Sequence, residues 1–392
     1  MNIAIGSGQT EALLAQAEAG TPLTAADALF LAEHAPVSAL LSTARVVRAR
    51  AKGSIVSYSR KVFIPLTTLC RDYCGYCTFR KDPGEPGAHF MSPDEVLALA
   101  EAGRKAGCKE ALFSLGDQPE AVFAEARTFL RRQGFSRTLE YLAAMCELVL
   151  ERVGLLPHAN PGLMPMEDLA RLKGSNASVG IMLENVSPRL LRNSQAHWHA
   201  PDKLPALRLQ TIEEAGRLQI PLTTGILIGI GETLAERFES LAVIRALHVR
   251  YGHIQEVIVQ NFRAKPGTRM AAHPDADLGN MLRMLAVARL MLPQNINLQA
   301  PPNLSYGEFP RLLEAGINDW GGISPVTLDF INPEAAWPQI SALGSATSAA
   351  GLELRERLAI YPEFIEKQGF VDPRVAVRID CLRDGRGYAR VG

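Results

Sequence analysis

Three cysteines lie close together in this sequence, where Cys70, Cys74 and Cys77 form a C-x3-C-x2-C pattern. Thiolates are soft ligands, and three of them on one loop can converge on an iron–sulfur centre. A cluster of four irons with three protein thiolates keeps one iron open, and an open position lets a metal bind another molecule. The pattern therefore predicts a metal centre that binds a substrate or cofactor. The other cysteines stand alone and are expected to be inert thiols: Cys108, Cys146 and Cys381.

Two other kinds of metal site fit the same three cysteines. A zinc site of the Cys3His type needs a histidine as its fourth ligand, which His89 or His158 would supply. Zinc sites usually pair C-x2-C elements, however, and this sequence has no second pair. A purely electron-carrying cluster would normally use four cysteines. Both alternatives stay open, and the cluster with an open iron is favoured.

Short apolar or β-branched runs alternate with helical patterns along the middle of the chain. This alternation predicts parallel βαβ units, and the number of runs predicts an α/β fold of the (β/α)8 TIM-barrel type. One helix start is well marked, because Ser92, Pro93 and Glu95 form a capping box. The predicted strands are 62–68, 111–115, 155–158, 177–183, 222–228, 256–261, 296–299 and 319–323.

The cysteine pattern directly follows the first predicted strand. In a barrel of this type the loops after the strands meet at one end, the mouth, where active sites are built. The loop after the second strand carries Gly116, Asp117 and Glu120, and the loop after the fourth carries Glu184. A polar turn or an acid at a helix start is the plainer interpretation of each. Their common position at the mouth favours a role beside the cysteines.

Composition and charge exclude several classes of protein. The 392 residues carry 41 basic and 41 acidic side chains, and 47% are hydrophobic. Zero net charge argues against nucleic acid as the main partner, because nucleic-acid binding rests on an excess of Lys and Arg. We also expect no membrane span and no secretory signal, since no apolar run is long enough and no basic segment precedes one. A cytoplasmic protein is therefore expected.

Three parts are expected along the chain. Residues 1–60 form a helical N-terminal extension, residues 61–340 form the barrel, and residues 341–392 form a helical C-terminal extension. The end of the first part is basic from Arg45 to Lys61. A solvated helix face is the favoured interpretation of these charges.

The cysteine pattern, with an aromatic residue before its last member, resembles that of the radical S-adenosylmethionine (SAM) superfamily. The run 225–232 is similar to the superfamily's G-x-I-x-G-x-x-E pattern. The resemblance implies that the three cysteines hold a [4Fe–4S] cluster, whose open iron binds SAM. It also implies cleavage of SAM to methionine and a 5'-deoxyadenosyl radical, which abstracts hydrogen from a substrate. The cofactor-binding residues that it implies are Tyr76, Gly116, Asp117, Glu120, Glu184, Gly225, Gly229 and Glu232.

Longer segments between about residues 62 and 337 are similar to one family within the superfamily, the 7,8-didemethyl-8-hydroxy-5-deazariboflavin (FO) synthases. They are 64–71, 113–120, 156–164, 179–185 and 319–325. This resemblance implies a carbon–nitrogen lyase of coenzyme F-420 biosynthesis. It would cyclise 5-amino-5-(4-hydroxybenzyl)-6-(D-ribitylimino)-5,6-dihydrouracil to FO with release of ammonia. Asp117, His158 and Asp319 are catalytic candidates, because they are expected at the mouth.

The same resemblance implies two protein partners. A companion radical SAM subunit would supply the substrate, and a low-potential flavodoxin or ferredoxin type of protein would supply electrons. The companion's own reaction, which joins tyrosine to a ribitylamino-uracil, is one alternative function for this chain. A non-catalytic iron–sulfur electron carrier is another.

Overall fold

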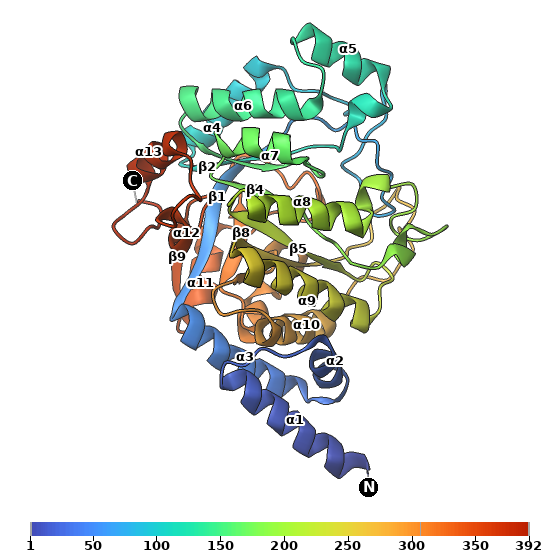
Figure 1. The fold of residues 1–392 in the computed structure, drawn as a ribbon, viewed down its shortest axis with the longest axis vertical. Coiled ribbons are helices and arrows are strands. Elements are labelled where there is room, and N and C mark those ends of the chain that lie inside the picture. The colour runs from blue at the N-terminus through green and yellow to red at the C-terminus, as the bar shows by residue number, and fades with distance from the viewer. Residues whose placement is uncertain (1, 306, 391–392) are drawn as a thin grey trace.

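Eight parallel strands close into a barrel in the computed structural model of this protein, which describes residues 2–305 and 307–390 (Figure 1). The strand order is β2-β3-β4-β5-β6-β7-β8-β1, and β1 pairs with both β8 and β2, so the sheet closes on itself. The predicted (β/α)8 fold is confirmed. The strands are β1 (Ile55–Pro65), β2 (Glu110–Ser114), β3 (Leu156–Asn160), β4 (Ser178–Gly180), β5 (Leu222–Ile228), β6 (Ile254–Asn261), β7 (Asn297–Gln299) and β8 (Asp319–Ile323).

Helices on the outside of the barrel connect consecutive strands, because parallel strands require a crossover. The helices cover the outer face of the sheet and the inner face surrounds the barrel interior, so every residue of β5 is buried. The connecting helices are α4 (Pro93–Lys105), α5 (Ala124–Arg132), α6 (Thr138–Arg152), α7 (Met166–Lys173), α8 (Pro205–Arg217), α9 (Leu234–Tyr251) and α10 (Leu278–Met291). Short 3-10 turns lie at Pro119–Ala121, Pro188–Leu191, Pro201–Lys203, Pro302–Ser305 and Phe309–Ala315.

Helix α4 begins with the capping box that the sequence predicts. The Ser92 side chain accepts from Glu95 N, and the Glu95 carboxylate accepts from Ser92 N at 2.8 Å. Two of the N–H groups that a helix start leaves unpaired are satisfied in this way. The cap sets where the helix between β1 and β2 starts.

Replacing Ser92 with alanine should therefore lower the free energy of unfolding by about 1 kcal/mol. Urea denaturation followed by circular dichroism measures this loss. Ser345→Ala is the matched control, because Ser345 is exposed inside helix α11 (Ile340–Ala349) and caps no N–H group. The control should stay within about 0.5 kcal/mol of the unsubstituted protein. Equal effects of the two changes would contradict the role of the cap.

The N-terminal part forms three helices at one end of the molecule, α1 (Asn2–Glu18), α2 (Ala25–His34) and α3 (Val37–Lys52) (Figure 1). Helix α2 packs against α9, and α3 packs against α10. Residues 2–18, 25–34 and 37–52 are therefore helical in the structure. Strand β1 begins at Ile55, however, which lies inside the range assigned to the predicted N-terminal extension.

The basic stretch before the cysteines is not a single solvated helix face. Arg48 on α3 is buried and donates to the carbonyl of Gly53 at 3.0 Å. Arg60 and Lys61 belong to β1, and Lys61 lines a cavity inside the barrel. The interpretation as a solvated helix face is therefore wrong for these three residues.

The C-terminal part contains a strand that the sequence analysis did not predict. Strand β9 (Glu353–Arg357) pairs in parallel with the first half of β1, whereas β2 pairs with the second half. Strand β9 thus occupies the edge of β1 that β2 leaves open. The rest of this part is helical, in α11, α12 (Pro362–Ile365) and α13 (Pro373–Leu382). No helix among the described residues is long and apolar enough to cross a membrane.

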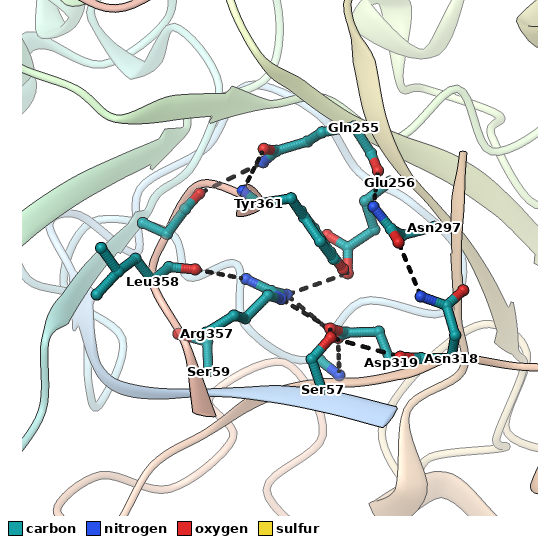
Figure 2. A network of polar contacts seen from close by, with 12 residues as sticks. Ser57, Ser59, Gln255, Glu256, Asn297, Asn318, Asp319, Arg357, Leu358 and Tyr361 are labelled. Atoms are coloured by element: carbon teal, nitrogen blue, oxygen red, sulfur yellow. Dashed lines mark hydrogen bonds and ion pairs between the residues drawn. The ribbon is translucent and has the colours of Figure 1, made fainter. Parts of the chain in front are cut away.

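After β9 the chain crosses the end of the barrel where the strands begin, and a buried polar network fills this end (Figure 2). Arg357 donates to Asp319 at 2.7 Å and to Glu256 at 3.1 Å. Tyr361 Oη donates to Glu256 at 2.8 Å, and Ser57 Oγ donates to Asp319. We call these five residues the floor network, because they close the barrel opposite its mouth.

Candidate active site

The cysteine loop follows β1 and is held by backbone hydrogen bonds to two other loops at the mouth. Arg71 N donates to the carbonyl of Asp117, after β2, at 3.0 Å. Gly75 N donates to the carbonyl of Ala196, after β4, at 2.6 Å. These bonds do not depend on side-chain identity. The barrel scaffold itself therefore positions the three cysteines.

Cys70, Cys74 and Cys77 line one cavity at the mouth, the upper cavity, which has a volume of about 210 Å³. Backbone N–H groups at positions 72 and 117 donate to Cys70 Sγ, at 3.4 and 3.2 Å. Burial raises the pKa of Cys74 to about 12 and that of Cys70 well above its usual value. Such thiols are poor nucleophiles on their own, whereas a bound metal deprotonates them. The donor set therefore suits a soft metal centre.

Gly116 lets the loop after β2 pass directly beside the cysteine loop. A Cβ atom at position 116 would lie 2.0 Å from the carbonyl oxygen of Leu69 and 2.6 Å from Cys70 Cβ. Neither atom can yield without moving the backbone of the cysteine loop. The close approach therefore requires glycine at this position.

Gly116→Ala should displace Cys70 and reduce the iron bound per chain by more than half. An overpacked site of this kind costs about 1–3 kcal/mol, so the protein is expected to fold. Iron content after cluster reconstitution is the measurement, with circular dichroism to confirm folding. Gly344→Ala is the control, because its Cβ would meet no atom closer than 3.9 Å. Unchanged iron content in the Gly116 variant would rule out this role for Gly116.

Asp117 is buried in the wall of the upper cavity and has one unsatisfied carboxylate oxygen. Its Oδ2 accepts from Leu163 N at 3.0 Å, whereas Oδ1 has no hydrogen-bond partner among the described residues. Burial, with a further contribution from Asp202 and Asp72, raises the pKa of Asp117 to about 8. A cationic donor in the upper cavity would satisfy Oδ1 and stabilise the ionised form. The residue thus fits the ammonium group of an amino acid.

Glu184 and Tyr76 line the same cavity. Glu184 has a left-handed backbone, with φ 62°, and its carboxylate pairs with Lys203 Nζ at 2.6 Å. The Tyr76 hydroxyl lies 3.1 Å from His197 Nε2. Leu227, from β5, adds apolar surface. The upper cavity therefore combines a thiol cluster, charged groups and an apolar wall, which suits a charged, nucleoside-containing ligand such as SAM.

A second cavity, the lower cavity, lies inside the barrel below the first and has a volume of about 180 Å³. Lys61, His158, Glu256 and Arg357 are among its lining residues. Only His158 of these was predicted as a site residue; the other three have side chains that face inward from β1, β6 and β9. The two cavities share the wall residues Ser114, Asn160, Met182, Gln260, Ile331 and Asn332.

The hydrogen bonds of His158 define which ring nitrogen carries the proton. His158 Nδ1 lies 2.7 Å from Ser178 Oγ, and the Ser178 hydroxyl donates to the carbonyl of Ala359. Because the hydroxyl has one proton, it must accept from Nδ1–H. Burial lowers the pKa of His158 to about 4, so the ring is neutral at pH 7. His158 therefore presents an unprotonated Nε2.

Four of the predicted cofactor-binding residues do not line either cavity: Glu120, Gly225, Gly229 and Glu232. Glu120 accepts from Thr138 N at 3.0 Å at the start of α6. A Cβ at Gly225 would lie 2.1 Å from the carbonyl of Ile258, so this glycine serves the packing of β5 on β6. Glu232 accepts from Gly229 N at 2.7 Å and thereby holds the loop after β5. The structure brings together the others: Cys70, Cys74, Cys77, Tyr76, Gly116, Asp117 and Glu184.

Asp319 does not lie at the mouth, and that expectation is wrong. It is the first residue of β8, and a parallel strand begins at the end of the barrel opposite the mouth. Its carboxylate belongs to the floor network, where Arg357 and Ser57 donate to it. Asp319 therefore has a structural position.

Neither histidine considered for a zinc site lies beside the cysteines. His89 is exposed and pairs with Glu95 at 3.0 Å, and His158 lies in the lower cavity. The structure therefore supplies neither of them as a fourth ligand. The three thiols face a cavity instead, which fits a centre with an open position.

Comparison with known proteins shows where the chain belongs. The family model described as the radical SAM superfamily matches residues 64–244. A 7,8-didemethyl-8-hydroxy-5-deazariboflavin synthase from Methanopyrus kandleri is 48% identical over 336 residues, which cover 86% of this chain and 100% of that protein. The chain belongs to this family of radical SAM enzymes. Its cofactor class is therefore a [4Fe–4S] cluster with SAM.

Longer relatives agree with this assignment, and solved structures agree with the fold. The FO synthases of Streptomyces coelicolor and Mycobacterium tuberculosis are 48% and 50% identical to the chain, which spans 45% and 40% of their lengths. The crystal structure of methylornithine synthase (PylB) has a TM-score of 0.69 at 20% identity, covering 87% of this chain and 97% of PylB. The hydrogenase maturase HydG from Carboxydothermus hydrogenoformans has a TM-score of 0.71 at 19% identity, covering 95% of this chain and 88% of HydG. These two structures support the fold.

Proposed function

We propose that this protein is the cyclising enzyme of FO formation. It converts 5-amino-5-(4-hydroxybenzyl)-6-(D-ribitylimino)-5,6-dihydrouracil to FO by closing the phenol ring onto the uracil part, with release of ammonia. It is thus a carbon–nitrogen lyase of coenzyme F-420 biosynthesis. The observation that carries the proposal is the 48% identity over the entire length of the Methanopyrus kandleri synthase.

The upper cavity holds the cofactors in this proposal. Cys70, Cys74 and Cys77 bind the [4Fe–4S] cluster, and Asp117 accepts from the amino group of SAM through its unsatisfied Oδ1. When both are bound and the cluster is reduced, the cluster and SAM would supply a 5'-deoxyadenosyl radical that abstracts hydrogen from the substrate. Lys203 and Glu184, which also line this cavity, would offer one charge of each sign to the polar groups of SAM.

The lower cavity holds the substrate. It is enclosed by the strands and by the floor network, and it opens toward the cofactors through the shared wall. Its lining combines amide and charged side chains with the aromatic rings of Phe63 and Trp337. This mixture suits a ligand that joins a phenol, a pyrimidinedione and a polyol. A site within the barrel also keeps a reactive intermediate away from bulk solvent and other molecules, which limits side reactions.

Two protein partners belong to the proposal. A companion radical SAM subunit supplies the substrate. A low-potential flavodoxin or ferredoxin type of protein reduces the cluster.

An anaerobic turnover assay tests the proposal. Reconstituted protein is mixed with dithionite, SAM and the purified product of the companion enzyme, and deoxyadenosine and fluorescent FO are quantified together. Both products should appear in step, and only when substrate is present. Deoxyadenosine reports the cleavage of SAM, whereas FO reports that this substrate is the one that is cyclised.

Three other results would each reject the proposal in a different way. Deoxyadenosine without FO would keep the radical SAM chemistry and reject this substrate. Production of the uracil–tyrosine adduct from tyrosine and ribitylamino-uracil would assign the companion's reaction to this chain. Absence of both products from protein with a full cluster would leave the electron carrier as the explanation.

A further inference from the structure

Two polar groups in the lower cavity have no hydrogen-bond partner among the described residues. They are the ammonium of Lys61, which can only donate hydrogen bonds, and Nε2 of His158, which can only accept one in its neutral form. Both groups line the cavity without a hydrogen bond to a described residue, so a ligand in the cavity can pair with each of them. Neither group has a role in the cofactor site described above.

Lys61 is held in the cavity by its surroundings and not by an ion pair. Among the described residues, no carboxylate lies within 4.0 Å of its Nζ, although Glu110 is its register neighbour on β2. The ammonium lies 5.2 Å from the centre of the Trp337 ring and 5.9 Å from that of Phe63. A Cβ at Gly322 would lie 2.3 to 2.5 Å from the end of the Lys61 side chain. Glycine at 322 thus keeps the space that this side chain occupies.

His158 is oriented just as firmly. Its Nδ1–H donates to Ser178 Oγ, and Ser178 Oγ donates to the carbonyl of Ala359, which lies in the segment that follows β9. A Cβ at Gly180 would lie 2.8 Å from Nε2, so glycine at this position leaves the face beside Nε2 open. No described residue donates to Nε2. The ring therefore offers a fixed acceptor to the cavity.

We propose that Lys61 and His158 form a donor–acceptor pair that binds the pyrimidinedione ring of the substrate in the lower cavity. The proposal rests on the proposed function and assigns one end of that substrate to one place. A pyrimidinedione carries carbonyl oxygens next to ring N–H groups, so it can accept from Lys61 and donate to His158. The rings of Phe63 and Trp337 supply flat apolar surface for a heterocycle.

This placement directs the rest of the substrate toward the mouth. The floor network closes the cavity below the ring, and the shared wall leads upward to the cysteines. A heterocycle bound by Lys61 and His158 therefore leaves its benzyl substituent on the side of the cofactors. Lys61 and His158 are binding residues in this scheme, and Ser178 is a positioning residue that acts through His158.

Equilibrium dialysis of purified FO against the cluster-loaded protein tests the pair, because FO retains the pyrimidinedione and is fluorescent. Lys61→Met keeps the length of the side chain and removes the donor. His158→Asn keeps an N–H toward Ser178 and removes the acceptor, whereas His158→Gln places an amide oxygen near the position of Nε2. Each lost contact to a charged or buried group should raise the Kd for FO by about 10- to 100-fold. His158→Gln should recover part of the affinity that His158→Asn loses.

Matched controls use the same substitutions outside the cavities. Lys105→Met changes an exposed lysine on α4, and His89→Asn changes an exposed histidine. Both should bind FO like the unsubstituted protein. Iron content and circular dichroism are recorded for every variant. If Lys61→Met lowers either of these, the His158→Asn and His158→Gln pair decides the question.

The possible failures are distinguishable. Unchanged FO affinity in Lys61→Met and His158→Asn, in a protein that binds and makes FO, would overturn the inference alone. Equal losses in His158→Asn and His158→Gln would overturn the assignment of Nε2 as an acceptor. An unsubstituted protein that neither binds nor makes FO would overturn the proposed function together with the inference.

Discussion

Cys74→Ala should abolish the iron–sulfur cluster and all cleavage of SAM. The change leaves two thiols for a cluster that needs three, and no other cysteine of the described residues lines the upper cavity. Iron should fall from about four atoms per chain to near zero. Iron and sulfide analysis of the reconstituted protein measures this, with the visible absorption of the cluster as a second readout. Cys70→Ala and Cys77→Ala should give the same result.

Cys146→Ala is the matched control for the cysteine variants. Cys146 is fully buried in α6, and burial raises the pKa of its thiol to about 12, as for Cys74. Its replacement leaves a small cavity that costs about 1 kcal/mol or slightly more. Iron content should equal that of the unsubstituted protein. A full cluster in the Cys74 variant would show that the ligand assignment is wrong.

Arg357→Met should lower the free energy of unfolding by about 3–5 kcal/mol, because it leaves the buried carboxylates of Asp319 and Glu256 without their cation. Burial already raises the pKa of Glu256 to about 7, and Arg357 holds it below what burial alone would give. Removing Arg357 raises the pKa of Glu256 in the folded protein further. Folded protein then takes up protons that unfolded protein does not, so the loss should be larger at pH 8 than at pH 5.

Arg355→Met on the same strand is the control for the floor network. Arg355 is partly exposed and pairs with Glu353 at 2.6 Å on the surface of β9. Removal of such a pair costs about 1 kcal/mol or less and should vary little with pH. Urea denaturation at the two pH values measures both variants. Equal losses for Arg357→Met and Arg355→Met would contradict a buried network that closes the barrel.

The barrel itself could be predicted from the sequence, because its signal is local. Alternating strands and helices, the capping box at Ser92 and the apolar run of β5 are each visible in short windows, and all three are confirmed. Strand β9 was missed because the reason that it forms a strand is not local. Its sequence, Glu353–Arg357, consists mainly of charged residues, and it becomes a strand because β1 offers a free edge about 300 positions earlier in the chain.

The sequence predicted the site residues in the loops that follow the strands, but most of the residues that line the lower cavity inside the barrel were missed. The cysteines, Gly116 and Asp117 follow strands directly, so their meeting at the mouth follows from topology. Lys61 was predicted to be exposed to solvent because it is charged. It lines the lower cavity instead, because side chains alternate between the inside and the outside of the barrel along β1 and position 61 faces inward. Asp319 is different, because the direction of a parallel strand already excludes its first residue from the mouth.

The pairing of β1 has a consequence for how the protein is made. Ser57 contacts Asp319, which lies 262 positions later, and Tyr58 contacts Glu356, 298 positions later. At a synthesis rate of about 5–20 residues per second, the first half of β1 waits roughly 15–60 seconds on the ribosome before its partners exist. An unpaired strand edge readily associates with other chains during such an interval. Lower growth temperatures, or a chaperone that covers the nascent strand, should therefore raise the yield of folded protein.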